Sequence, residues 1–117
     1  MLALNQADVV SLKIPPPDVD DGIVSQALLA APGLRVTLFR FDAGQELSEH
    51  TSPARVTLQV LAGSGDFTLG TETRRLVAGD LLHMPPQLPH AVRAVEDLTF
   101  LLTQAWPPVA GGKAAQS

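Results

Sequence analysis

Two histidines are the residues of this 117-residue chain whose type and spacing could do chemistry. Five residues separate Gly44 from His50. The same gap separates Gly79 from Pro85, and four further residues precede His90. Imidazole nitrogen is a natural ligand for zinc, iron, nickel, copper and manganese. If strands bring the two rings together from distant parts of the chain, the pair could hold such an ion or hydrogen-bond a small molecule.

The elements that must position these rings have the pattern of β-strands. Turn-forming residues recur every eight to twelve positions, and no helical period is sustained. Residues 55–61 alternate most clearly, with Val56, Leu58 and Val60 on one face and Arg55, Thr57 and Gln59 on the other. Further strands are expected at residues 23–30, 34–41, 66–69, 73–77, 81–84, 90–95 and 98–103, and hairpin turns at 63–65 and 70–72. Many short strands predict an all-β sandwich or barrel.

The length of the chain fits a single folding unit with one core. Consecutive prolines within residues 15–17 fix φ and remove amide donors, so residues 1–22 are expected to form an extended N-terminal segment. The barrel itself is predicted for residues 23–106. Residues 107–117 lack any apolar period and are expected to form a flexible C-terminal tail.

Composition excludes several classes of function. The net charge of −4 and the absence of a basic run argue against nucleic acid as a partner. Without cysteine, any metal must be held by nitrogen and oxygen ligands. No apolar run approaches the roughly 20 residues of a membrane helix, and residues 1–11 lack the pattern of a secretion signal. We therefore expect no membrane partner and a cytoplasmic location.

The glycine and histidine spacings resemble the two motifs of the cupin family. The first family motif is a glycine, a histidine five residues later, a second histidine, a glutamate and a closing glycine. Its positions hold, in order, Gly44, His50, Ser52, Val56 and Gly63. The resemblance therefore keeps the two glycines and the first histidine but replaces two of the three family ligands.

The second family motif is a glycine, a proline, a glycine, a histidine and an asparagine. Its positions hold, in order, Gly79, Pro85, Gln87, His90 and Ala94. The resemblance covers about residues 35–103 and implies a single small cupin domain, a double-stranded β-helix or jelly-roll barrel.

The resemblance implies that His50 and His90 point into the barrel and bind one divalent transition metal ion, such as zinc, nickel, iron or manganese. Catalytic metal sites typically use three protein ligands. A serine hydroxyl at position 52 is a weak ligand, and Val56 cannot bind metal and is expected to make that wall of the cavity apolar. The alternative is no metal at all, with both rings hydrogen-bonded to each other, to water or to a ligand.

Ser52, Val56, Gln59 and His83 are further candidates for contact with a ligand. Gln59 would face inward only if a β-bulge near Pro53 shifted the register by one residue. His83 precedes Pro85 on an expected strand and could face the cavity or the solvent. Glu46 has the same strand parity as His50 and could add a carboxylate.

Three functions are compatible with these residues, and the sequence leaves open whether the protein is an enzyme. It could bind a small molecule in an apolar cavity, with the histidines holding the polar end of the ligand. It could be a metal-dependent oxygenase or isomerase that uses His50 and His90. It could also be a filled barrel that acts through its surface. The loss of two ligands favours the first, and a homodimer is expected, with residues 23–29 adding to the sheet of a neighbour.

Overall fold

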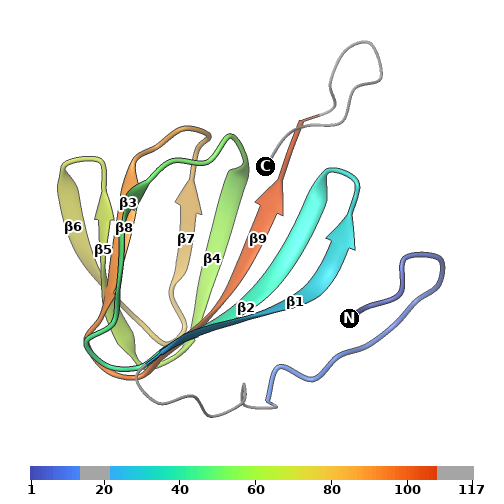
Figure 1. Ribbon diagram of the computed structural model, residues 1–117, viewed down its shortest axis with the longest axis horizontal. Coiled ribbons are helices and arrows are strands. Elements are labelled where there is room, and N and C mark those ends of the chain that lie inside the picture. Colours follow the sequence, from blue (N-terminus) through green and yellow to red (C-terminus); the bar gives the residue numbers. More distant parts are fainter. Residues whose placement is uncertain (14–21, 108–117) are drawn as a thin grey trace.

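The computed structural model describes residues 1–13 and 22–107, and every regular element in these ranges is a β-strand (Figure 1). The strands are β1 (Ile23–Ala31), β2 (Leu34–Phe41), β3 (Glu46–His50), β4 (Arg55–Ala62), β5 (Ser64–Leu69), β6 (Glu72–Val77), β7 (Leu81–Met84), β8 (His90–Ala94) and β9 (Leu98–Ala105). The prediction of an all-β fold is confirmed.

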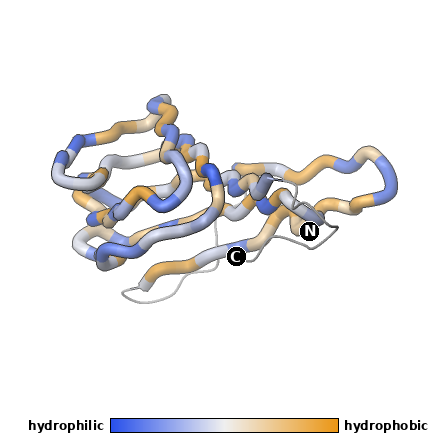
Figure 2. Tube along the Cα trace, turned by 90° about the horizontal axis from the view of Figure 1, so that it is seen from above, coloured by the Kyte–Doolittle hydropathy of each residue, from blue (hydrophilic) through white to orange (hydrophobic). Residues whose placement is uncertain are grey.

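The strands form two antiparallel sheets that pack face to face as a jelly-roll barrel. One sheet has the order β1-β2-β9-β4-β7 and the other the order β3-β8-β5-β6. Figure 2 views the barrel from above and shows the N-terminal end outside it. Strands that are distant in sequence, such as β4 and β9, are thus neighbours in one sheet, which is how remote residues reach a common interior.

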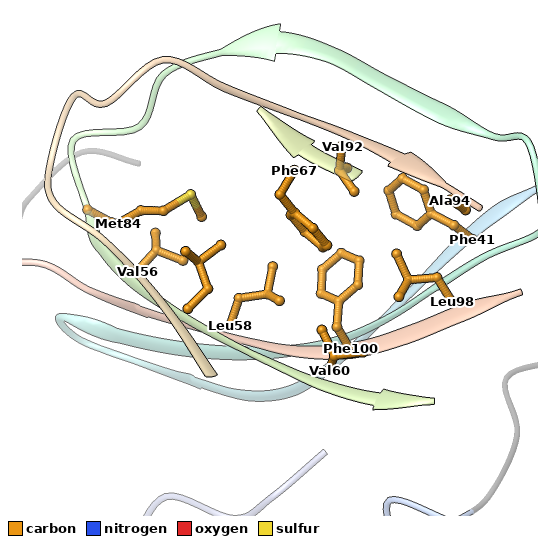
Figure 3. Close-up of a cluster of buried hydrophobic side chains, with 12 residues drawn as sticks. Phe41, Val56, Leu58, Val60, Phe67, Met84, Val92, Ala94, Leu98 and Phe100 are labelled. Carbon is orange, nitrogen blue, oxygen red and sulfur yellow. The ribbon is translucent and has the colours of Figure 1, made fainter. Parts of the chain in front are cut away.

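The core lies between the two inner faces and follows the alternation seen in the sequence. In β4, Val56, Leu58 and Val60 are at most 3% exposed, while the residues between them face outward. They pack with apolar side chains from both sheets (Figure 3). The ring of Phe100 lies 5.2 Å from that of Phe39 and 6.0 Å from that of Phe67 (centroid to centroid), so aromatic side chains join the sheets.

The expected hairpin turn at residues 63–65 is wrong. Strand β4 belongs to the five-stranded sheet and β5 to the four-stranded sheet, so Gly63 is the point where the chain crosses between them. Its φ of +78° lies in a region that glycine adopts without strain and other residues rarely adopt. A Cβ at this position would also collide with the backbone carbonyl of Asp97. Beyond the crossing, the Ser64 hydroxyl donates to Glu96 Oε1 at 2.7 Å. The other expected hairpin is confirmed, because Gly70 and Thr71 join β5 to β6.

The described part of the N-terminal segment, residues 1–13, contains no helix or strand. The amide of Leu2 donates to the carbonyl of Leu28 at 2.6 Å. Leu2, Val10 and Leu12 face Leu28, Val36 and Leu101 across a shallow hollow on the outside of the five-stranded sheet. The remainder of the predicted segment, residues 14–21, and residues 108–117 of the predicted tail lie outside the described residues. In the ranges that are described, no helix is long and apolar enough to cross a membrane.

Strand β1 forms one edge of the five-stranded sheet. Its nine residues include no charged side chain, whereas the edge strands β3 and β6 of the other sheet carry several. Charges on an edge usually prevent pairing with another chain. The strand is nevertheless irregular between Ala27 and Leu29, and its Leu28 carbonyl already accepts from Leu2. The homodimer through this strand stays a prediction.

The crossing at Gly63 makes a prediction about stability. We expect Gly63→Ala to lower the free energy of unfolding by about 3 kcal/mol or more, because backbone strain of about 1–2 kcal/mol adds to the collision with Asp97. Gly44→Ala is the matched control, since Gly44 also has a positive φ, of +87°, but no atom near its Cβ position. Urea denaturation measures both variants, and equal losses would contradict the crossing geometry.

Candidate functional site

The two histidines lie opposite each other in neighbouring strands of the four-stranded sheet. Strands β3 and β8 are antiparallel neighbours (Figure 1). His50 ends β3 and His90 begins β8, and the two residues are cross-strand partners. Their ring centroids are 4.1 Å apart, with 62° between the ring planes. The structure thus brings together the pair that the glycine spacings single out.

An irregularity in β3 decides which of its residues face inward. The register of β3 with β8 shifts between Leu47 and His50. In a regular strand, residues three positions apart point to opposite faces, yet Leu47 and His50 both line the cavity. The strand parity that would place Glu46 beside His50 is therefore broken. Glu46 instead lies opposite Arg93, whose Nε is 3.5 Å from a Glu46 carboxylate oxygen. The structure therefore does not support the possibility that Glu46 adds a carboxylate beside the histidines.

Backbone carbonyls set the protonation pattern of both rings. The Nδ1 of His50 lies 3.0 Å from the carbonyl oxygen of Ser48, and the Nδ1 of His90 lies 2.8 Å from that of Leu88. A carbonyl oxygen can only accept, so each Nδ1 must carry a hydrogen and donate. In the neutral ring, the Nε2 then bears a lone pair. Neither Nε2 has a hydrogen-bond partner among the residues that the structure describes.

Burial favours the neutral form of His90. It lowers the pKa of this imidazole below its ordinary value of 6.5, because the charged ring would lose hydration. The hydrogen bond to the Leu88 carbonyl opposes this shift, and a positive charge on His50 would add to it. His90 is therefore an acceptor at neutral pH.

Both rings line a cavity of about 270 Å³ between the sheets. All four phenylalanines of the chain line it. The polar side chains in its wall are those of His50, Thr51, Ser52, His90 and Gln104, and no Asp, Glu, Lys or Arg side chain within residues 1–13 and 22–107 lines it. Among these residues, the two imidazoles are thus the titratable groups of the cavity wall.

Ser52 and Val56, which replace two ligands of the family motif, both line this cavity. Val56 is 3% exposed and, as expected, makes its part of the wall apolar. The Ser52 hydroxyl accepts a hydrogen bond from the Ala54 amide at 3.2 Å, and the Ser52 carbonyl accepts one from the Gln87 amide at 2.8 Å. Ser52 thus shapes the loop between β3 and β4 as well as bordering the cavity.

The structure places Gln59 and His83 outside the cavity. Gln59 lies on the exposed outer face of β4, because the irregularity in this strand falls between Val60 and Ala62 and not near Pro53. His83 is exposed on β7, where its Nε2 accepts a hydrogen bond from Arg55 Nη1 at 2.8 Å. These two candidates are therefore not among the residues that line the cavity, and the outward position of Gln59 is the one expected without a bulge near Pro53.

Gln104 is a cavity residue that the sequence reasoning missed. It lies in β9 directly opposite Val56 of β4, and it has the same strand parity as Phe100 and Leu102, which also line the cavity. The expected last strand ended at residue 103, whereas β9 continues to Ala105. Continuing its alternation by one residue would have found Gln104.

A family comparison agrees with this architecture. Residues 37–103 match the family model described as a cupin domain. The chain belongs to the cupin family. A search of curated proteins found no match to the sequence.

Solved structures share this fold. A protein of unknown function, SPY1581 from Streptococcus pyogenes, is 30% identical with a TM-score of 0.75, over 86% of this chain and 93% of that one. A cupin superfamily protein from Desulfitobacterium hafniense is 22% identical with a TM-score of 0.75, over 79% and 84% of the two chains. A salicylate 1,2-dioxygenase from Pseudaminobacter salicylatoxidans is 23% identical with a TM-score of 0.69, over 77% of this chain but 28% of its own. The last two likenesses concern the fold alone.

Cupins often bind a metal, but the donors of this cavity do not fit a three-ligand divalent centre. Two imidazole nitrogens are available, while the position of the family glutamate holds the apolar Val56. Among the described residues, no group of three His, Cys, Asp or Glu side chains could hold a metal ion. An uncharged pair of ligands leaves the charge of a dication without compensation in a largely apolar wall.

The lowered pKa of His90 predicts how stability depends on pH. At pH values above 6.5 the His90 ring is mainly neutral in both the folded and the unfolded chain, so the stabilisation that depends on its neutral form is fully present there. Below pH 6.5 the unfolded chain binds protons first, so the free energy of unfolding falls. We expect His90→Gln to reduce the dependence of the free energy of unfolding on pH between about pH 5 and 7, as measured by urea denaturation. His83→Gln, on the outer face, should leave this pH dependence unchanged. An unchanged slope in His90→Gln would contradict the assignment.

Proposed function

We propose that this cupin binds a small, largely apolar organic molecule in its barrel, with His50 and His90 holding the polar end of that molecule. The observation that carries the proposal is a cavity of about 270 Å³ with a phenylalanine-rich wall and a single pair of adjacent imidazoles. Binding sites for small molecules are typically apolar hollows with a few polar groups that orient the ligand.

The size of the cavity limits the ligand. An engineered apolar cavity of about 150 Å³ holds benzene. A cavity of about 270 Å³ therefore suits a single ring with one or two small substituents, or an aliphatic molecule of similar bulk.

The two alternative functions have weaker support. A barrel filled by its own side chains is inconsistent with the cavity. A metal-dependent enzyme would have two of the three usual ligands, and the similarity to salicylate 1,2-dioxygenase, at 23% identity, is one of fold. Neither alternative accounts for the apolar wall at Val56 as directly as a binding pocket does.

A variant that fills the cavity tests the proposal. We expect several compounds from a panel of monosubstituted benzenes to bind the protein in ligand-observed NMR and in calorimetric titration. Leu102→Trp should weaken this binding at least about tenfold, because the larger side chain occupies the hollow that Leu102 lines. Gln59→Trp, which adds the same side chain to the outer face, should leave binding unchanged. No binding by any compound, or equal binding by both variants, would contradict the proposal.

Metal uptake gives a separate test. After incubation with Zn²⁺, Ni²⁺, Mn²⁺ or Fe²⁺ and gel filtration, elemental analysis of untagged protein should find much less than one ion per chain, because the cavity offers a pair of ligands where such centres use three. Near-stoichiometric metal that disappears in both His50→Ala and His90→Ala would instead support the metal-dependent alternative.

A further inference from the structure

Both histidines line the cavity, and each ring carries one hydrogen-bond acceptor, its Nε2. Each Nδ1 donates a hydrogen bond to the main-chain carbonyl two residues earlier in the chain, that of Ser48 for His50 and that of Leu88 for His90. These carbonyls cannot donate, so the rings cannot reverse their roles without losing both hydrogen bonds. The two Nε2 acceptors therefore belong to rings whose centroids are 4.1 Å apart, close enough for neighbouring donors of one ligand to approach both.

The surrounding wall supplies no charge that could bind an anion. Within the described part of the chain, none of the residues lining the cavity is Lys or Arg. The nearest arginine along β8, Arg93, is engaged with Glu46, and Arg55 donates to His83 on the outer face of the other sheet. A carboxylate placed against the rings would meet no cation and would be set beside two acceptor nitrogens, which cannot donate to it.

From these observations we infer that the site selects uncharged ligands that donate hydrogen bonds to His50 and His90, and that it rejects carboxylates of the same shape. Two adjacent donors, such as neighbouring hydroxyl groups on one ring, match the two adjacent acceptors. Gln104, on the facing sheet, offers an amide to any polar atom on the opposite side of the ligand. This inference rests on the proposed binding function and specifies the chemistry of its ligand.

A matched set of probes tests the selectivity. Catechol has two donors, phenol one, fluorobenzene none, and benzoate presents a charged acceptor on the same ring. At pH 7.5 we expect affinity to fall in that order, with catechol binding at least about tenfold more tightly than benzoate, since each neutral hydrogen bond contributes up to about a tenfold effect. Benzoate binding as tightly as catechol would overturn the inference.

Variants locate the selectivity on the rings. His90→Phe keeps a flat side chain but removes one acceptor, so the preference for catechol over fluorobenzene should fall about tenfold. His83→Phe is the control on the outer face and should preserve the preference. Circular dichroism establishes that each variant is folded. An unchanged preference in a folded His90→Phe variant would overturn the inference.

The ring protonation can be measured without any ligand. Long-range proton–nitrogen NMR correlations at pH 7.5 should show, for both His50 and His90, a protonated Nδ1 and an unprotonated Nε2. A protonated Nε2 on either ring would overturn the inference, even if the cavity still binds small aromatic compounds. Failure of every probe to bind, with the expected ring protonation, would instead contradict the proposed function.

Discussion

The site depends on one cross-strand contact, the pairing of the end of β3 with the start of β8 that sets His50 beside His90. The backbone does two jobs there. It brings the rings to a centroid separation of 4.1 Å, and its carbonyls at Ser48 and Leu88 accept from both Nδ1 atoms. The hydrogen-bonding character of the cavity depends on these carbonyls as much as on the imidazoles, because the carbonyls determine that Nε2 is the acceptor nitrogen of each neutral ring.

The substitutions within the first cupin motif decide the electrostatics of the cavity. Val56 occupies a core position of β4 as an apolar side chain. Among the described residues, the cavity wall contains no Asp, Glu, Lys or Arg, so it carries a charge only when an imidazole is protonated. A cavity with a carboxylate would favour cations, whereas an apolar one with two acceptors favours neutral donors. The barrel is retained because its core needs only the alternation of apolar residues, which Val56 continues.

Local patterns in the sequence predicted the strands and the histidine pair. The alternation at residues 55–61 correctly placed Val56 inside and, without a bulge, would have placed Gln59 outside. The resemblance to the cupin motifs implied that His50 and His90 meet inside the barrel, and their rings are 4.1 Å apart. Turn residues are informative because glycine permits the positive φ that many turns need, and proline fixes its own φ.

Features that depend on contacts between distant strands were not predictable in this way. The shift between Leu47 and His50 reverses strand parity and turns Glu46 outward, and it depends on how β3 meets β8. Residues 63–65 have the sequence of a hairpin turn, but the strands before and after them lie in different sheets and do not pair with each other. The pairing of Gln104 with Val56 joins β9 to β4 and is likewise a contact between distant strands, although the alternation of β9 alone, continued by one residue, gives the inward direction of Gln104.

Nuclear Overhauser contacts between the two imidazole rings test the central claim most directly. With centroids 4.1 Å apart, the carbon-bound ring protons of His50 and His90 should give cross-peaks in the ligand-free protein at neutral pH. The stacked rings of Phe39 and Phe100, at 5.2 Å, serve as an internal reference within the same core. Cross-peaks for the phenylalanine pair without any for the histidine pair would contradict the account.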